Sequence, residues 1–127
     1  MARPKTMYIT EAEENLANII WREDPLTSPE LVALAEHELN WKKSTTYTIL
    51  KRLCGKGVFS NVNANVSVLL TRDELSAKQS RRFVEDIFGG ELPKLISAFI
   101  GEKPLSPKQA EEIRKIIDEY EGGEDDG

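Results

Sequence analysis

The sequence predicts a mainly α-helical protein with one small β-hairpin. Apolar residues recur at intervals of three and four along six stretches, which is the period of an amphipathic helix. A Ser or Thr helix-start signal precedes four of these stretches. Directly after the third stretch, two short runs rich in β-branched residues flank a turn-prone segment, which predicts a hairpin. Three helices followed by a hairpin have the order of a winged helix-turn-helix, and further helices follow it.

Composition limits the classes of protein to which the chain can belong. Its 127 residues suit one domain or two small modules that share a core, and 39% of them are hydrophobic. No apolar run reaches the length of about 18 residues needed to span a membrane, and no secretory signal follows the basic start. One cysteine, Cys54, and one histidine, His37, are too few for a metal site or an intrachain disulfide. We expect a cytoplasmic protein with no metal, no cofactor and no insertion into the membrane.

Two helices are expected before residue 40. The first starts at the capping box Thr10-Glu11-Ala12-Glu13, where a hydroxyl and a carboxylate satisfy free backbone donors, and it runs to about Trp21. Asp24-Pro25 is expected to break this helix. The second helix starts at Ser28-Pro29, with serine as N-cap and proline at the first helical position. Its expected inward residues are Leu31, Leu34, Ala35 and Leu39.

The third helix is expected to begin at Lys43 or Ser44 and to run to Leu53 or Cys54, ended by the glycines that follow. Trp41 precedes it and is interpreted as a core anchor rather than a base-stacking residue. Cys54 is interpreted as a small buried hydrophobe, with redox sensing as the alternative. The predicted buried stripe of this helix comprises Thr46, Ile49, Leu50 and Leu53.

The predicted hairpin joins strands at Val58–Asn61 and Val66–Leu70 across residues 62–65. No Lys or Arg occurs between Gly57 and Thr71, so the wing carries no basic residue for phosphate. Thr71 then opens a fourth helix that ends at Gly89-Gly90, a fifth follows, and Ser106 starts a sixth. We predict a winged-helix DNA-binding domain over 1–71, a helical dimerisation domain over 72–121 and a disordered acidic tail over 122–127.

Charge is distributed unevenly along the chain. The net charge is −5, yet the stretch from Trp41 to Gly57 contains five basic residues and no acid. A cationic helix with short hydroxyl side chains suits contact with phosphates and base edges in a major groove. We expect phosphate contacts from Lys42, Lys43 and Lys56. For Arg52 there are two interpretations, a phosphate contact and a structural ion-pair partner. The candidate base-reading residues are Ser44, Thr45, Tyr47, Thr48 and Lys51.

The helices after the hairpin carry more apolar surface than a small module buries by itself. A second copy of the chain is the simplest partner for this surface, and a monomeric core is the alternative. The expected dimerisation residues are Phe83, Ile87, Leu95, Ile96, Phe99, Ile113, Ile116, Ile117 and Tyr120.

Short motifs spread over roughly residues 8–120 follow the pattern of one protein family. They are Ile9-Thr10-Glu11-Ala12-Glu13, Ile19-Ile20-Trp21, Asn40-Trp41, Thr45-Thr46, Thr48-Ile49-Leu50, Arg52-Leu53, Lys56-Gly57, Phe83, Gly89-Gly90, Ala98-Phe99 and Leu105-Ser106. In these residues the sequence resembles the BlaI/MecI/CopY family of bacterial winged-helix repressors, also called the penicillinase repressor family. Metal sensing through the paired Cys-x-Cys motifs of its copper-responsive branch does not apply to a chain with one cysteine.

This resemblance implies a homodimeric repressor whose winged helices bind a palindromic operator in double-stranded DNA. In the β-lactam branch, a membrane sensor-protease system triggers cleavage of the repressor, usually at an Asn-Phe bond. Here the matching bond is Ala98-Phe99. The alternative function is a winged-helix protein-interaction module without operator binding. An enzyme ranks third, because the sequence shows no nucleophile, metal cluster or phosphate loop.

Overall fold

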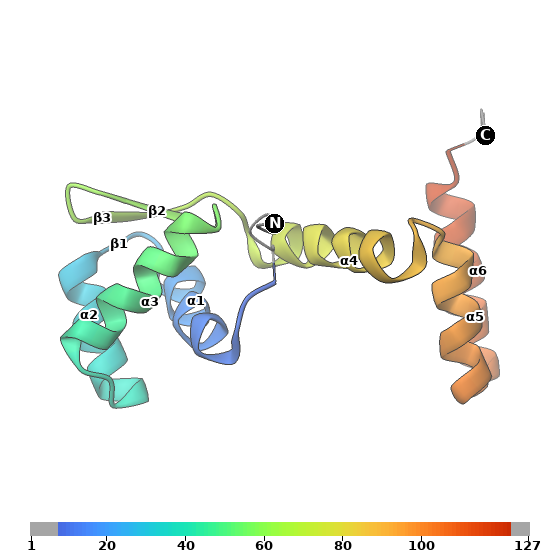
Figure 1. Ribbon diagram of the computed structural model, residues 1–127, viewed down its shortest axis with the longest axis horizontal. Helices are drawn as coiled ribbons and strands as arrows, with labels where there is room; N and C mark the ends of the chain where they lie inside the picture. Colours follow the sequence, from blue (N-terminus) through green and yellow to red (C-terminus); the bar gives the residue numbers. More distant parts are fainter. Residues whose placement is uncertain (1–7, 123–127) are drawn as a thin grey trace, which may run out of the picture. The chain divides into compact units, whose positions relative to one another are not determined.

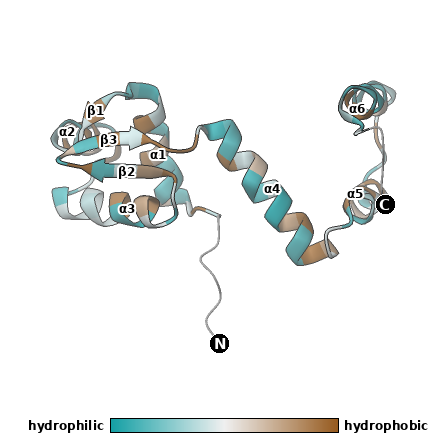
Figure 2. Cartoon of the chain, turned by 90° about the horizontal axis from the view of Figure 1, so that it is seen from above, coloured by the Kyte–Doolittle hydropathy of each residue, from teal (hydrophilic) through white to brown (hydrophobic). Residues whose placement is uncertain are grey.

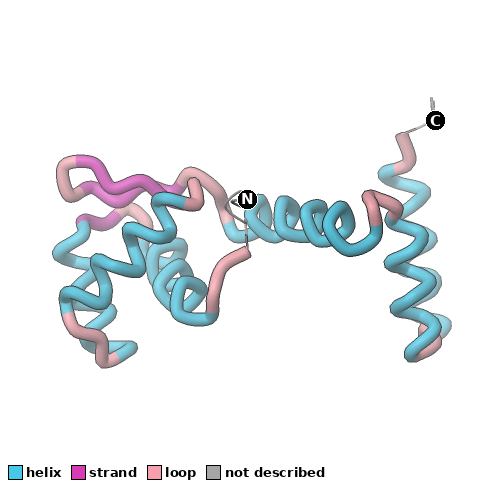
Figure 3. The backbone as a smooth tube through the Cα atoms, viewed as in Figure 1, coloured by secondary structure: helices cyan, strands magenta, loops and turns pink. Residues whose placement is uncertain are grey.

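The computed structural model describes residues 8–122, and these contain six helices and a three-stranded antiparallel sheet (Figures 1 and 3). The prediction of a mainly α-helical chain with a hairpin wing and later helices is confirmed. Contacts divide the chain into two compact units, with the boundary between Phe83 and Val84. We call residues 8–83 the winged unit and residues 84–122 the C-terminal unit.

Helix α1 (Glu11–Glu23) starts as predicted but runs two residues further than expected. The Glu13 amide donates to Thr10 Oγ1 at 3.1 Å, and the Thr10 amide donates to Glu13 Oε1 at 2.9 Å. Both bonds satisfy backbone groups at the helix start, which is the function of a capping box. The sequence therefore determines this helix start locally.

A two-residue strand, β1 (Leu26–Thr27), was not predicted, because two residues are too few to show an alternating pattern. It pairs with β3 through Leu26 opposite Val66 and Thr27 opposite Asn65.

The predicted cap of helix α2 (Ser28–Leu39) was wrong by one residue. Thr27 is the N-cap and forms a capping box with Glu30, while Ser28 is already helical and buried. Thr27 satisfies the Thr-x-x-Glu pattern that Ser28 lacks.

Helix α3 (Lys43–Gly55) has the predicted buried stripe of Thr46, Ile49, Leu50 and Leu53. Gly55 is the last residue of the helix, one position beyond the predicted end at Leu53 or Cys54. The chain turns at Gly57, whose φ of +82° lies in the left-handed region that glycine adopts without a steric penalty.

Strands β2 (Phe59–Val62) and β3 (Asn65–Val68) form the wing, slightly displaced from the predicted ranges. They are antiparallel, and Val62 lies opposite Asn65 next to the two-residue turn. Asn63 and Ala64 both have positive φ values, of 52° and 65°. This combination defines the type I′ turn that matches the twist of hairpin strands, but alanine is less favourable there than glycine. Ala64 is therefore a strained position in the wing.

The core of the winged unit lies between the three helices and the inner face of the sheet. Trp21 is half-buried at the edge of this core: its Nε1 donates to the Leu70 carbonyl at 2.9 Å, and its ring lies 5.5 Å from that of Phe59. The guanidinium of Arg72 stacks 4.8 Å from the Trp21 ring centroid. The buried core residues include Leu16, Ile20, Leu31, Leu50, Leu53, Val58, Phe59 and Leu75.

Three helices follow the wing: α4 (Arg72–Phe88), α5 (Leu92–Glu102) and α6 (Pro107–Tyr120). Leu75 of α4 packs in the winged core, so the contacts place the start of this helix with the winged unit, whereas the predicted domain boundary lies at residue 71. The predicted caps Thr71 and Ser106 both bond the helix amides. Of the predicted tail 122–127, residues 123–127 lie outside the described residues.

The C-terminal unit contains no buried side chain among its described residues 84–122. Its helices nevertheless carry large apolar residues alongside polar ones, as the hydropathy colouring shows (Figure 2). A helical unit normally derives its stability from burying such side chains. None of the helices described over residues 8–122 combines the length and the apolar composition that a membrane span requires.

Candidate nucleic-acid interface

The outward face of α3 is the strongest candidate site in the winged unit. Burial of the opposite stripe fixes which side chains of this helix face solvent. The predicted base-reading residues Ser44, Thr45, Thr48 and Lys51 are all exposed, as are Lys42, Lys43 and Arg52. We call these seven residues the recognition face. Four are cationic, three carry hydroxyl groups and none is acidic, so this surface is chemically suited to a polyanion.

Tyr47 differs from the other predicted base-reading residues. It is half-buried, packs against the core, and its hydroxyl donates to Ser28 Oγ at 3.3 Å. Ser28 is the first residue of α2 and is 3% exposed. The ring of Tyr47 is therefore held toward α2, and we leave this residue out of the recognition face.

Lys56 also differs from the prediction, which assigned it to phosphate. Its ammonium donates to Glu13 Oε1 at 2.7 Å and to the Tyr8 carbonyl at 2.9 Å. The Glu13 side chain is 2% exposed and that of Lys56 is 16% exposed. The ion pair thus joins the start of α1 to the residue that follows α3, and Lys56 has a partner within the fold.

The electrostatics of Glu13 follow from this environment. Burial on its own would raise the pKa of the carboxyl group, but the hydrogen bonds from Lys56 and the Thr10 amide, with the charges of Lys56 and Arg52, lower it below its usual value. Glu13 is thus held as a carboxylate inside the winged unit. Arg52 contributes to this stabilisation while its own side chain is exposed.

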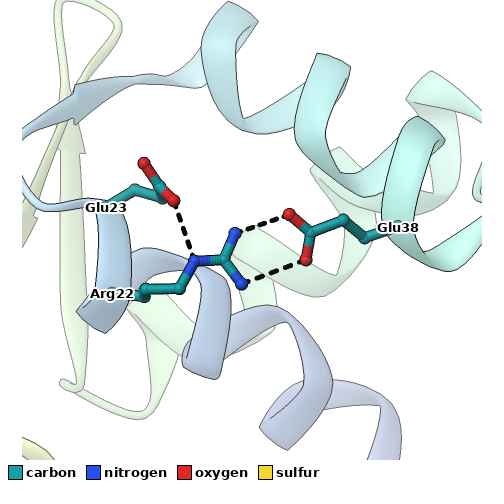
Figure 4. A network of polar contacts seen from close by, with 3 residues as sticks. All are labelled: Arg22, Glu23 and Glu38. Carbon is teal, nitrogen blue, oxygen red and sulfur yellow. Dashed lines mark hydrogen bonds and ion pairs between the residues drawn. The ribbon is translucent and has the colours of Figure 1, made fainter.

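A second ion-pair network joins α1 to α2 (Figure 4). The Arg22 guanidinium donates to both carboxylate oxygens of Glu38, at 2.5 and 3.1 Å, and to Glu23 at 2.8 Å. The hydrogen bond from Arg22 lowers the pKa of Glu38, and the bonds to Glu38 and Glu23 raise that of Arg22. These side chains are solvent-exposed, so their contribution to stability is small. They connect the two helices that precede α3.

The wing carries no charged residue anywhere between Gly57 and Thr71. Its exposed polar groups are amides and hydroxyls, including those of Asn61, Asn63 and Asn65. Such groups form hydrogen bonds at short range but exert no long-range attraction on phosphate. Contacts made by this wing therefore depend on where the fold holds it.

Metal and thiol chemistry find no support among the described residues. Within residues 8–122, no cluster of three metal-ligating side chains occurs, and His37 is exposed on α2. Cys54 is half-buried, and burial raises the pKa of its thiol. A thiol with a raised pKa is less reactive, which favours its interpretation as a small apolar residue.

The predicted dimerisation residues are largely exposed. Phe99, Ile116 and Ile117 are each more than half exposed, and Tyr120 is 79% exposed. In the C-terminal unit, a groove of about 270 Å³ lies between α5 and α6. It is lined by Leu95, Ile96, Phe99, Ile100, Leu105, Gln109 and Ile113. Ala98-Phe99, the bond matched to the family cleavage position, lies inside α5.

Comparisons with known proteins find one family over both units. A family model described as penicillinase repressor matches residues 9–119. The methicillin resistance regulatory protein MecI of Staphylococcus aureus strain N315 is 26% identical over 117 residues, covering 89% of this chain and 95% of the relative. Penicillinase repressors of Staphylococcus aureus and Bacillus licheniformis are 24% and 23% identical, and each alignment covers 91% of this chain and 94% of the relative.

Proposed function

Because the chain belongs to the penicillinase repressor family, we propose that it is a cytoplasmic transcriptional repressor that binds operator DNA through α3. Its family is one of regulatory proteins, and the chain is not an enzyme. The observation that carries the DNA-binding proposal is the recognition face, an exposed and acid-free surface on the third helix of a winged helix-turn-helix. In this architecture the corresponding helix enters the major groove.

Within the recognition face, different side chains have different tasks. Lys42 and Lys43 stand at the start of α3 and contact phosphate, which sets affinity without reading sequence. Ser44, Thr45, Thr48 and Lys51 read base edges, and Arg52 reaches phosphate near the end of the helix. Lys56 is given a structural role and no DNA contact, because its ammonium is bound to Glu13.

The C-terminal unit supports the homodimer in this proposal. A unit with no buried side chain over residues 84–122 gains little stability from its own packing. A second copy supplies an identical apolar surface, and a twofold axis lets one patch pair with itself. Two recognition helices related by such an axis match the two halves of a palindromic operator.

A salt titration tests the DNA-binding proposal. Binding of the wild type to DNA upstream of its own gene should weaken steeply as salt increases, because bound phosphates release counterions. In a dimer, Lys42→Ala should lower affinity for all duplexes and reduce the salt slope by about 2. Lys51→Ala should cost roughly tenfold on the operator and less on a random duplex.

Lys108→Ala provides the matched control, since it removes an exposed cation from α6, outside the recognition face. This variant should bind like the wild type. Absence of wild-type binding would contradict operator binding and leave a protein-interaction module as the better account. Equal binding by all variants would contradict the role proposed for the recognition face.

Relief of repression by proteolysis is the last part of the proposal. Cleavage of Ala98-Phe99, triggered by a membrane sensor-protease system, would cut α5 and detach the chain that contains α6 from the winged unit. The bond is helical, so α5 has to unwind locally before a protease accepts it as an extended strand. After a β-lactam challenge of cells, we expect a fragment ending at Ala98 by mass spectrometry. Persistence of the intact chain while repression is lifted would argue for another signal.

A further inference from the structure

Ser28 lies where the recognition helix, the second helix and the wing meet. Its amide donates to the Ala64 carbonyl in the wing turn at 2.8 Å, and its hydroxyl oxygen accepts from Tyr47 of α3 at 3.3 Å. The residue is 3% exposed, so its hydroxyl group is nearly inaccessible to solvent. One buried serine therefore contacts both elements that a winged helix presents to DNA.

The wing contact involves a strained residue. Ala64 adopts a φ of 65°, which costs a residue with a Cβ atom more than it costs glycine. Such strain persists where the surrounding structure holds the backbone in place. Here the Ser28 amide binds the Ala64 carbonyl, and the neighbouring pair Thr27 and Asn65 adds β1 to the sheet. The start of α2 thus restrains the turn of the wing.

We propose that Ser28 and Tyr47 are positioning residues that hold the wing and the recognition face of α3 in one fixed relation for DNA binding. This proposal rests on the proposed function. Tyr47 acts through its hydroxyl group toward Ser28 and not through base contact, which explains why it is half-buried whereas Ser44, Thr45 and Thr48 are exposed.

Because the wing is uncharged, its binding depends on the position in which Ser28 and Tyr47 hold it. Residues 57–71 contain no charge, so electrostatic attraction does not draw the wing toward phosphate. Its amides and hydroxyls bind only when they already lie within hydrogen-bond distance. Holding a binding element in its bound conformation lowers the entropy lost on association. The start of α2 therefore holds the wing in the position to which basic residues in a charged wing would be attracted by phosphate.

A double-mutant cycle with two readouts tests the proposal. The variants are Tyr47→Phe, Ser28→Ala and their combination. Because each single variant removes the same neutral hydrogen bond, we expect each to weaken operator binding roughly three- to tenfold and the double variant to be no weaker than the weaker single variant. The salt slope should remain that of the wild type. Hydrogen exchange of the amides in residues 59–68 should become faster in all three proteins without DNA.

Ser28→Ala separates positioning from direct contact, because a buried serine does not reach DNA. Ser76→Ala is the matched control: this exposed serine lies on α4, and its loss should change neither readout. Additive losses in the double variant, unchanged exchange in both single variants, or unchanged operator affinity would each overturn the proposal. If the wild type binds no operator, the proposed function fails, and hydrogen exchange alone decides whether Ser28 and Tyr47 restrain the wing.

Discussion

Replacing Lys56 with methionine is expected to destabilise the winged unit by about 3 kcal/mol at pH 7, since it leaves a buried carboxylate without its partner. Glu13 is 2% exposed and receives both the Lys56 ammonium and the Thr10 amide on the same oxygen. Methionine retains most of the apolar stem of lysine, so the loss reports on the charge. Chemical denaturation followed by circular dichroism measures the change in the free energy of unfolding.

The dependence on pH distinguishes this ion pair from a packing effect. The folded protein lowers the pKa of Glu13 below its ordinary value of 4.5, so the pair stabilises the fold above that pH and the contribution is lost as pH falls through the folded pKa. In Lys56→Met, burial still raises the pKa of Glu13, but no lysine is present to lower it. The difference in stability between wild type and variant should therefore be larger at pH 7 than at pH 3.

Two controls accompany Lys56→Met. Adding Glu13→Gln to it removes the unpaired charge and should recover most of the lost stability, because glutamine still accepts from the Thr10 amide. Glu38→Gln breaks the exposed pair with Arg22 and should change stability little. A Lys56→Met variant as stable as the wild type at pH 7 would show that the ion pair is not a major stabilising contact.

Phe99→Asp is expected to convert the proposed dimer into a monomer at micromolar concentration. The side chain is 61% exposed in the single chain and borders the groove between α5 and α6. A large aromatic residue at the centre of an interface commonly contributes enough that its loss raises the dissociation constant on the order of 100-fold. Sedimentation equilibrium measures the mass, and operator affinity should fall with it because each monomer of the proposed dimer would hold one half-site.

Leu69→Asp is the matched control for this prediction. Leu69 is 54% exposed but belongs to the winged unit, outside the proposed interface. The same apolar-to-acid change should leave the mass of a dimer unaltered. Circular dichroism shows whether each variant keeps its helices. A wild type that sediments as a monomer, or a Phe99→Asp protein that remains a dimer, would refute the assignment of this surface.

Much of the fold was predictable because its determinants are local. The capping bonds at Thr10, Thr71 and Ser106 join residues three positions apart, so they are visible as short motifs. The buried stripe of α3 follows from the helical period alone. The same period identified the apolar helices of the C-terminal unit and, with the acid-free stretch before Gly57, the recognition face.

The differences between the sequence predictions and the structure have a common physical cause. Lys56 was expected on phosphate, but it pairs with Glu13, 43 positions earlier in the chain. Tyr47 was expected to read bases, but its hydroxyl meets Ser28, 19 positions away. Strand β1 is too short to show a period and exists through its pairing with β3. Each depends on how helices and strands pack together, and no spacing within a single element records that geometry.

The sequence by itself determined the order of the helices, the hairpin and the side of α3 that faces outward, because local hydrogen bonds and the helical period are written in consecutive residues. Only the tertiary structure decided which basic and hydroxyl side chains remain available on that side. The Lys56 ammonium contacts Glu13, and the Tyr47 hydroxyl contacts Ser28. Each of these contacts lowers the free energy of the folded protein. Their partners come together only when α1, α2 and α3 pack around one core.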